Sequence, residues 1–226
     1  METNSACRVV VLIGGNGSNL QALIDDTRQH NRSYSIVGVI SHRPDAYGLI
    51  RAQNASIATT VVDHRQYDAQ AFESALLDAV KAYSPTLIVM AGFMRILTAE
   101  FVDQFPTQIL NIHPSLLPKF RGLHTHQRAL EAGETEHGVS VHYVTKELDG
   151  GPIIAQIKVP VLPDDEVDTL KDRVFTAEHW LYPQVVEWYA QKRLKCVENI
   201  VTLDGERLGP LGLQLTLPTV RSNANL

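Results

Sequence analysis

The chain has 226 residues, of which 44% are hydrophobic and 20% are charged, values typical of a globular protein with a substantial core. Its formal net charge is −5, and because proteins that bind nucleic acid normally present a basic face, this charge argues against a nucleic-acid partner. The apolar run at residues 9–13 is too short for a signal peptide and lacks the positively charged start that one requires, and no run approaches the length of a membrane span.

The two cysteines, Cys7 and Cys196, lie near opposite ends of the chain. Neither has a second cysteine or a histidine at the spacing of a metal site, and two such residues do not make a disulfide framework. We therefore expect two reduced thiols in a cytoplasmic protein that has no metal and no membrane contact.

Short apolar runs alternate with helical patterns along the first half of the chain. We predict strands at residues 9–13, 36–40, 58–62, 87–91 and 109–113. We predict helices that begin at Ser18, with Ser18 or Asn19 as the cap, and at residues 47–54, 69–83 and 98–105. This alternation predicts βαβ units and a parallel sheet with helices on both faces. Ligands of such sheets bind beyond the carboxyl ends of the strands.

The second half has a different pattern. Residues 139–144 and 152–160 read as more antiparallel strands around the turn at Asp149, and residues 166–190 form a long helical pattern that is interrupted at Pro183. We therefore predict an α/β, Rossmann-like fold with a mostly parallel sheet, helices on both faces and a more antiparallel C-terminal half. Residues 1–200 would form one catalytic domain, and residues 201–226, rich in Gly, Pro and Asn, a loosely packed tail.

The glycine-rich segment GGNGSNL, residues 14–20, connects the first predicted strand to its helix. Backbone N–H groups at such a helix start form an anion site. A dinucleotide fingerprint would need a third glycine at Leu20, and a P-loop would end in Gly-Lys-Ser/Thr, so neither pattern fits. The residues Gly17, Ser18 and Asn19 suit one phosphate monoester. The alternative is a tight turn with a good helix cap.

The segment NIHPSLLP, residues 111–118, closes the last strand of the parallel half. Pro114 keeps His113 extended, so Asn111 and His113 share one face of the strand. Asp149 is the natural third member, because its Gly-Gly turn lets the backbone approach closely and because a carboxylate favours the charged form of a nearby histidine. Two donors and one acceptor match the needs of acyl transfer to an amine, whereas Asp149 alone would read as an ordinary turn residue.

Other polar and aromatic residues give weaker patterns. His124 and His126 resemble a metal pair, but no third ligand has a suitable spacing, so we expect a loop with two exposed histidines. Residues 94–97 follow a strand end and suit either a pocket for a flat ring or a helix start with buried aliphatic side chains. Trp180 and Trp188 lie two helical turns apart, which indicates core packing.

Six segments together resemble a known family: NGSNLQALID, AGFMRIL, LNIHPSLLPKF, GLHTH, HGVSVHYVT and ELDGGPII. In this order they resemble the phosphoribosylglycinamide formyltransferases, folate-dependent enzymes of purine synthesis. The resemblance extends from about residue 9 to about residue 194. The NIHPSLLP and DGG segments are shared with other folate-dependent formyltransferases and hydrolases, whereas the NGSNL loop separates this family from them.

The resemblance implies that a formyl group passes from the co-substrate 10-formyltetrahydrofolate to the amine of glycinamide ribonucleotide (GAR), without a metal. It implies that the substrate phosphate is held by Gly17, Ser18 and Asn19, and its ribose by Glu178. The catalytic residues would be Asn111, His113 and Asp149, with His113 as the proton donor. The folate would be held by Met94, Arg95, Ile96, Leu97, Asn111, Thr145, Lys146, Glu147, Leu148 and Asp149, and Arg65 is a displaced candidate for a further folate contact.

Three other functions share parts of this pattern. A methionyl-tRNA formyltransferase would need a basic region for tRNA, and a formyltetrahydrofolate hydrolase usually has an extra N-terminal domain, for which there is no space before residue 9. A sugar-phosphate-binding module without catalysis would need only the glycine loop. We therefore expect small-molecule partners, GAR and folate, and either a monomer or a homodimer.

Overall fold

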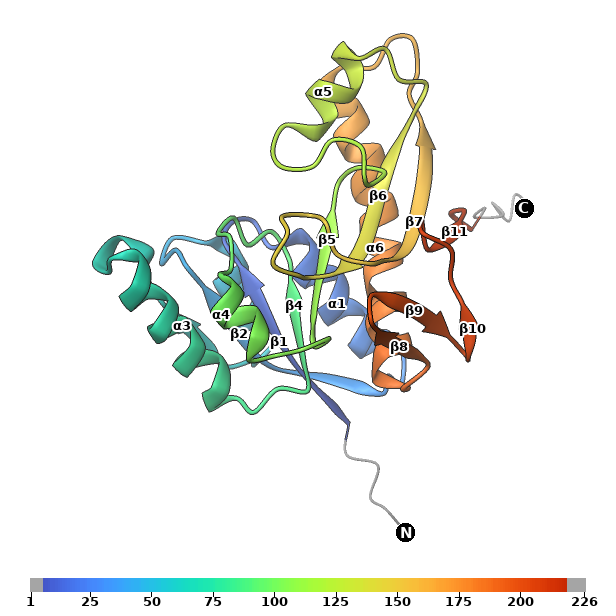
Figure 1. Cartoon of the computed structure of the whole chain (residues 1–226). Coiled ribbons are helices and arrows are strands. Elements are labelled where there is room, and N and C mark those ends of the chain that lie inside the picture. The colour runs from blue at the N-terminus through green and yellow to red at the C-terminus, as the bar shows by residue number, and fades with distance from the viewer. Residues whose placement is uncertain (1–5, 219–226) are drawn as a thin grey trace, which may run out of the picture.

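A computed structural model of the chain describes residues 6–218 (Figure 1). Its centre is an eight-stranded sheet with the order β11-β7-β6-β5-β4-β1-β2-β3, and a three-stranded sheet has the order β10-β9-β8. The strands are β1 (Cys7–Ile13), β2 (Tyr34–Ser41), β3 (Thr59–Val61), β4 (Leu87–Met90), β5 (Ile109–His113), β6 (Glu136–Tyr143), β7 (Ile153–Pro160), β8 (Leu194–Val197), β9 (Ile200–Leu203), β10 (Glu206–Arg207) and β11 (Leu213–Leu215). The helices are α1 (Ser18–Gln29), α2 (Tyr47–Asn54), α3 (Ala69–Ala82), α4 (Ala99–Asp103), α5 (Thr125–Glu131), α6 (Val167–Ala190) and the 3₁₀ helix η1 (His64–Gln66).

β1 is the centre of the parallel half, where it pairs with β2 on one side and β4 on the other. Its side chains alternate between two hydrophobic clusters, so that Val9 and Val11 belong to one and Val10 and Leu12 to the other. α1 and α6 contribute to the first cluster, and α3 and α4 to the second (Figure 1). The predicted α/β class, with helices on both faces of a mostly parallel sheet, is confirmed.

β5 is the strand at which the sheet changes direction. It pairs in parallel with β4 and antiparallel with β6, and β6 pairs antiparallel with β7. In this register Asn111 lies opposite Met90 of β4 and opposite His142 of β6, while His113 lies opposite Ser140. The more antiparallel C-terminal half that the sequence predicts therefore begins directly beside Asn111 and His113.

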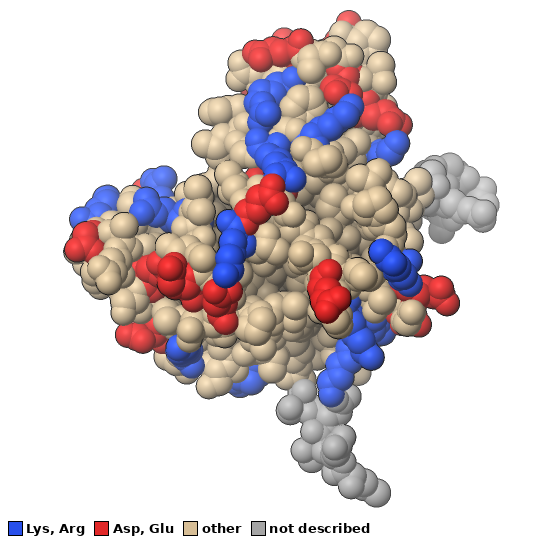
Figure 2. Space-filling model, in the orientation of Figure 1, with Lys and Arg blue, Asp and Glu red and all other residues tan. Residues whose placement is uncertain are grey.

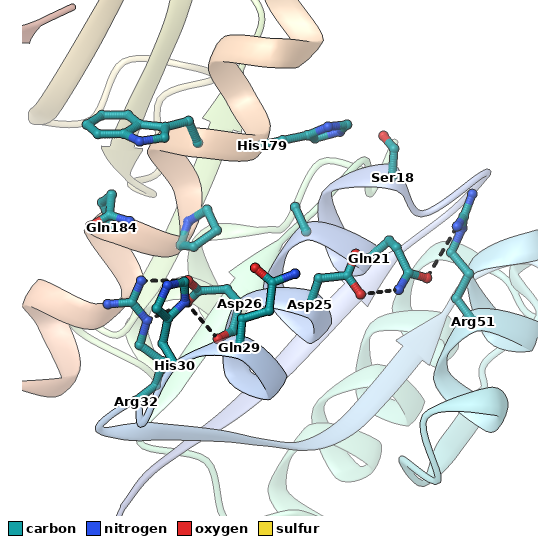
Figure 3. Close-up of a pocket in the computed structure, with 13 residues that line it drawn as sticks. Ser18, Gln21, Asp25, Asp26, Gln29, His30, Arg32, Arg51, His179 and Gln184 are labelled. Atoms are coloured by element: carbon teal, nitrogen blue, oxygen red, sulfur yellow. Dashed lines mark hydrogen bonds and ion pairs between the residues drawn. The ribbon is translucent and has the colours of Figure 1, made fainter. Parts of the chain in front are cut away.

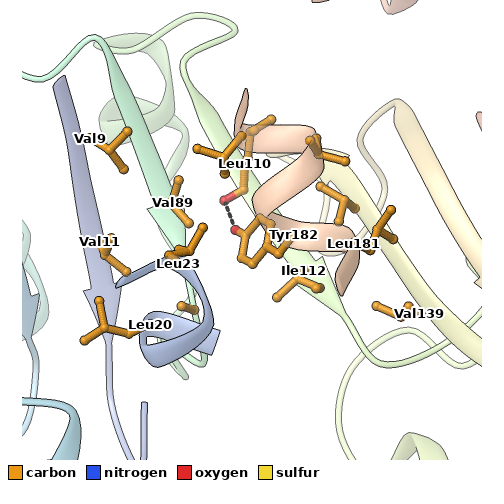
Figure 4. Packing of buried hydrophobic residues seen from close by; sticks show 14 of the residues in the cluster. Val9, Val11, Leu20, Leu23, Val89, Leu110, Ile112, Val139, Leu181 and Tyr182 are labelled. Carbon is orange, nitrogen blue, oxygen red and sulfur yellow. Dashed lines mark hydrogen bonds between the residues drawn. The ribbon is translucent and has the colours of Figure 1, made fainter. Parts of the chain in front are cut away.

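α6 crosses the sheet as one helix of 24 residues and packs against α1, β6 and β7. The predicted interruption at Pro183 is wrong, because this proline lies buried inside the continuous helix. The hydroxyl of the neighbouring Tyr182 is fully buried, and its one hydrogen is shared between the carbonyl oxygens of Met90 at 2.8 Å and Leu110 at 3.1 Å. Figure 4 shows the contact with Leu110. These contacts join α6 to β4 and β5 at the turn that contains Pro183. None of the helices in residues 6–218 is long and apolar enough to cross a membrane.

The residues after β8 form short strands where the structure describes them. β9 and β10 complete the small sheet, and β11 adds to the edge of the main sheet in parallel with β7. Val201 is buried, and Leu213 and Leu215 pack against the main core. Residues 201–218 of the expected tail therefore contain regular strands, although most of their side chains are exposed or only partly buried, and residues 219–226 lie outside the described part. Glycines with positive φ, Gly205 at 88° and Gly212 at 66°, form turns between these short strands.

Tyr182→Phe should lower the free energy of unfolding by about 1–3 kcal/mol, because it removes a buried donor from two strand carbonyls. Urea denaturation followed by circular dichroism measures this loss. Tyr189→Phe is the matched control, since the Tyr189 hydroxyl donates to one accessible carbonyl, that of Thr86, at 3.2 Å. Equal losses in the two variants would contradict a special role for Tyr182.

Candidate active site

The loop after β1 ends in Gly17, the N-cap residue of α1. Gly17 has a φ of 74°, in the left-handed region that favours glycine, and a Cβ added there would lie 2.7 Å from the Cα of Gly48. No side chain caps α1, so the expectation that Ser18 or Asn19 supplies the cap is wrong. The first N–H groups of α1 are therefore free to bind an acceptor from outside the helix, such as an anion.

Asn19 contacts α6 at Glu178, although the two residues are 159 positions apart. Nδ2 of Asn19 donates to Oε2 of Glu178 at 2.7 Å, and the exposed fractions are only 9% for Asn19 and 3% for Glu178. Burial raises the pKa of Glu178 to about 7, and the hydrogen bond from Asn19 opposes this shift. Oδ1 of Asn19 is buried and has no hydrogen-bond partner in residues 6–218, which is uncommon for a buried polar atom.

A groove of about 700 Å³ runs between α1 and α6 (Figure 3). Ser18 and His179 lie at one end of it, and they are the sequence neighbours of Asn19 and Glu178, so this end adjoins the buried pair. Along its length several polar side chains are paired with one another, as Arg32 is with Asp26. The groove is lined by Ser18, Gln21, Ala22, Asp25, Asp26, Gln29, His30, Arg32, Arg51, His179, Trp180, Pro183 and Gln184.

Asn111 and His113 lie at the C-terminal end of β5, on the face of the sheet that they share with Ile109. Ile109 belongs to the cluster under α3 and α4, so both polar side chains face that side of the sheet. Nδ2 of Asn111 lies 3.2 Å from Nε2 of His142 on the neighbouring strand. The structure thus places two polar side chains side by side where the hydrophobic cluster ends.

His113 is held from two sides and is only 6% exposed. Its Nε2 lies 3.0 Å from the carbonyl oxygen of Phe120, and because a carbonyl only accepts, this nitrogen carries a hydrogen. Its Nδ1 faces Oδ2 of Asp149 at 3.5 Å, which is an ion-pair distance and not a short hydrogen bond. Both ring nitrogens therefore face acceptors, an arrangement that accommodates a ring protonated on both nitrogens.

Asp149 reaches this position because the loop between β6 and β7 folds back over the face of the sheet (Figure 1). Asp149 has a φ of 47°, which is uncommon for a residue other than glycine. Its Oδ2 also accepts from the N–H of Gly122 at 2.9 Å. A Cβ at Gly151 would overlap the carbonyl oxygen of Tyr143, so the turn needs glycine there to pass close to β6.

The predicted folate residues after β4 divide into exposed and buried side chains. Met94 is 70% and Ile96 73% exposed, whereas Leu97 is 8% exposed and belongs to the hydrophobic cluster under α3 and α4. The guanidinium of Arg95 lies 5.3 Å from the centre of the Phe72 ring. Met94 and Ile96 therefore offer an apolar surface that is available to a ligand.

The predicted folate residues between β6 and β7 lie in a loop with charged contacts on both sides. Lys146 pairs with Asp103 of α4 at 2.8 Å, and Glu147 pairs with Arg121. Leu148 is 51% exposed, and Oγ1 of Thr145 accepts from the N–H of Glu147 at 3.4 Å.

Arg65, the displaced folate candidate, is instead paired with Asp63 at 2.8 Å. Its guanidinium is therefore engaged within η1 and its N-cap, and no contact connects it to Asn111 or His113 in the described chain.

The histidines near residue 125 differ from expectation. His124 is exposed and is the N-cap of α5, a short helix that the sequence analysis did not predict. His126 is partly buried, so the expectation that it is exposed is wrong, and its Nδ1 lies 3.2 Å from Nε2 of His137. Burial lowers the pKa of both His126 and His137 to about 4. Within the described chain no three His, Cys, Asp or Glu side chains are grouped to hold a metal ion.

Two residues of β6 that the sequence analysis did not single out face this site. His142 contacts Asn111, and Ser140 accepts from the N–H of Leu117 at 3.0 Å and donates to the carbonyl oxygen of Ser115 at 2.7 Å. Ser140 and His142 alternate with the apolar residues Val139, Val141 and Tyr143, and this alternation is the signal that indicates a polar face.

Known proteins resemble this chain over most of its length. Residues 7–186 match the model of the family described as formyl transferase. The chain is 51% identical over 205 residues to the phosphoribosylglycinamide formyltransferase of Escherichia coli strain K12, a match that covers 90% of this chain and 97% of that protein. The solved structure of phosphoribosylglycinamide formyltransferase from Coxiella burnetii has a TM-score of 0.90 and 50% identity, over 93% of this chain and 99% of that one. Glycinamide ribonucleotide transformylase 1 from Symbiobacterium toebii has a TM-score of 0.85 and 42% identity, over 88% and 94%.

Glu178→Gln should make the free energy of unfolding depend less on pH. The pKa of Glu178 is raised to about 7, so the folded state keeps a proton that the unfolded state releases above a pH of about 4.5. The free energy of unfolding of the wild type therefore decreases as the pH rises from about 4.5 to about 7. Glutamine stays neutral. The stability of the variant relative to wild type should therefore rise across this window by on the order of 3 kcal/mol and then level off. Urea denaturation at several pH values tests this, and a difference that is constant with pH would contradict it.

Proposed function

The chain belongs to the formyl transferase family, and we propose that it transfers a formyl group from 10-formyltetrahydrofolate to the amine of N1-(5-phospho-D-ribosyl)glycinamide (GAR). The product is formyl-GAR, and the reaction is a step of de novo purine synthesis. The observation that carries the proposal is the meeting of Asn111, His113 and Asp149 at the end of β5, through contacts of 3.2 Å to His142 and 3.5 Å between His113 and Asp149.

The chemistry needs donors for an oxyanion and an acceptor for a proton. Attack of the GAR amine on the formyl carbon places negative charge on the formyl oxygen. The Asn111 amide would donate a hydrogen bond to this oxygen, and the positive charge of a protonated His113 ring would stabilise it electrostatically. Loss of one such donor typically costs about 2.7–4 kcal/mol in the transition state. Asp149 would stabilise the charged His113 ring and receive the proton that the amine loses, directly or through water. The carbonyl would then re-form as the bond between the formyl carbon and N10 of the folate breaks, and the same proton would pass to N10, so that formyl-GAR and tetrahydrofolate leave together. Proton transfer of this kind contributes about 10²–10⁴-fold.

The phosphate and ribose of GAR would bind at the start of α1. The free N–H groups after Gly17, in Ser18 and Asn19, favour a phosphate, since the positive end of the helix dipole points the same way. Glu178 lies against Asn19 and would meet the ribose hydroxyls. The unpartnered Oδ1 of Asn19 supports the presence of a polar ligand next to this pair.

The folate co-substrate would lie against the opposite face of the sheet. The exposed side chains of Met94 and Ile96 suit the flat pterin ring, and the loop from Thr145 to Asp149 covers the same face. Arg95, Leu97, Lys146, Glu147 and Leu148 complete the proposed folate residues together with Asn111 and Asp149. The formyl group is already activated on N10 of the folate, so the residues need only orient it and stabilise charge.

Three alternatives use parts of the same site. A methionyl-tRNA formyltransferase would need a broad basic surface, but on the face in Figure 2 Lys and Arg are interspersed with Asp and Glu. A formyltetrahydrofolate hydrolase would use water in place of the amine. A sugar-phosphate-binding module would use the start of α1 and leave Asn111, His113 and Asp149 without a role.

The proposal includes a cytoplasmic location, small-molecule partners, and a monomer or homodimer. The thiols of Cys7 and Cys196 are free, which suits a reducing compartment.

An assay of the purified protein with 10-formyltetrahydrofolate tests the proposal. We expect formyl-GAR and tetrahydrofolate to form together, only when GAR is present, and chromatography of both products measures this. Parallel reactions contain water alone or initiator methionyl-tRNA as the acceptor. Folate hydrolysis that is independent of GAR, formylated tRNA, or GAR binding without any turnover would each replace the proposal with one of the three alternatives.

Asp149→Asn should lower kcat by at least about 100-fold, because the amide keeps the size of the side chain but cannot accept the proton. The KM for GAR should change by less than about threefold, since the phosphate site is separate. Asp168→Asn is the matched control, because the Asp168 side chain is 89% exposed at the start of α6. Near-normal turnover of the Asp149 variant would remove this carboxylate from the mechanism.

A further inference from the structure

His142 is a buried histidine beside the proposed catalytic residues. It lies directly opposite Asn111 across the antiparallel pair of β5 and β6, and it is 2% exposed. Its two ring nitrogens have different partners. Nδ1 lies 2.8 Å from the carbonyl oxygen of Tyr143, and Nε2 lies 3.2 Å from Nδ2 of Asn111.

These two contacts determine where the hydrogen atoms are. A carbonyl oxygen has no hydrogen to donate, so Nδ1 of His142 must carry one and donate it to Tyr143. Burial lowers the pKa of His142 well below its ordinary value, so the ring is neutral near pH 7. Nε2 then has a lone pair and no hydrogen, and it can only accept.

An acceptor at Nε2 fixes the orientation of the Asn111 amide. The amide of an asparagine can turn by half a rotation at almost no cost unless a neighbour distinguishes its oxygen from its nitrogen. Here the NH₂ group must point to His142, because the amide oxygen would face a lone pair. One N–H donates to Nε2 and the second N–H is left for the substrate.

We propose that His142 is a positioning residue that holds the Asn111 amide with its NH₂ group at the reacting centre. This inference rests on the proposed function. Without the acceptor, the amide samples the turned orientation, in which its oxygen faces the oxyanion and repels it. His142 therefore acts on the reaction through Asn111 and not by contact with either substrate.

The contacts of His142 also argue against a second role, that of a positively charged partner of Asp149. Nε2 of His142 is 3.9 Å from Oδ1 of Asp149, but it has no hydrogen to donate to it. Asp149 instead receives the N–H of Gly122 and faces His113. A neutral His142 therefore leaves the charge of Asp149 to interact with His113.

The proton position can be measured without any assay of activity. ¹⁵N-detected NMR of protein labelled at histidine, with His142 assigned by its absence from His142→Gln, should show Nδ1 protonated and Nε2 unprotonated near pH 7. A ring protonated on Nε2, or on both nitrogens, would overturn the inference. This measurement stands even if the wild-type protein makes no formyl-GAR, so failure of the inference and failure of the proposed function are distinguishable.

Two substitutions then test the effect on catalysis. His142→Leu removes the acceptor and should lower kcat on the order of tenfold to a hundredfold, with both KM values within about twofold, because a transition-state contact is misoriented. His142→Gln is the matched variant, since its side-chain oxygen can accept from Asn111, and it should keep a clearly higher kcat. Equal losses in the two folded variants, or a loss confined to KM, would contradict the positioning role.

A double-mutant cycle distinguishes positioning from a general structural effect. In an Asn111→Ala background there is no amide left to orient, so adding His142→Leu should change kcat by less than about twofold. Full additivity of the two losses would overturn the inference. Circular dichroism and urea denaturation of all variants establish that each is folded.

Discussion

The site depends on the register of β5 between a parallel neighbour and an antiparallel one. β4 fixes Asn111 opposite Met90, and β6 fixes it opposite His142, so the strand is held from both sides. A shift of one residue would turn Asn111 and His113 to the other face, against α1 and α6, and would bring Ile112 to the face of α3 and α4. Such a shift would bury polar groups among aliphatic side chains, which is costly. The hydrophobic pattern that stabilises the sheet therefore also determines on which face the candidate catalytic residues lie.

Backbone carbonyls give both buried histidines of this site a defined role. The carbonyl of Phe120 takes the hydrogen on Nε2 of His113, and the carbonyl of Tyr143 takes the hydrogen on Nδ1 of His142. In each ring, one nitrogen therefore donates to a backbone carbonyl. The other nitrogen faces a proposed catalytic side chain, which is Asp149 for His113 and Asn111 for His142. A buried polar group without a partner is costly, so the same contacts that satisfy these rings also fix their hydrogen positions.

Local patterns in the sequence predict much of this arrangement, and pairing between distant segments determines the rest. The apolar runs predict the parallel strands, and the period of two places Asn111 and His113 on one face. The position of Asp149 is less evident from the sequence. Because β6 is antiparallel to β5, β6 ends beside the start of β5, and the loop that follows must fold back along the sheet to bring Asp149 to His113. The roles of His142 and of Glu178 beside Asn19 require the register of β6 and the packing of α6 on α1, which no local pattern contains. The short helix α5 and the strand β11 were missed because α5 is too short to be stable without tertiary packing and β11 pairs with the distant β7.

The two proposed substrate sites lie on opposite faces of the sheet and meet beyond the carboxyl ends of its parallel strands. Asn19 and Glu178 lie with the α1 and α6 cluster, whereas Asn111, His113 and the exposed residues after β4 lie on the side of α3 and α4. A ribonucleotide held by its phosphate at the start of α1 and a folate held against the other face can approach each other only beyond the carboxyl ends of β1, β4 and β5, where the parallel strands stop. β5 is the strand among these three that also has an antiparallel neighbour, and its end is therefore the place where residues from both halves of the fold can surround one carbonyl carbon.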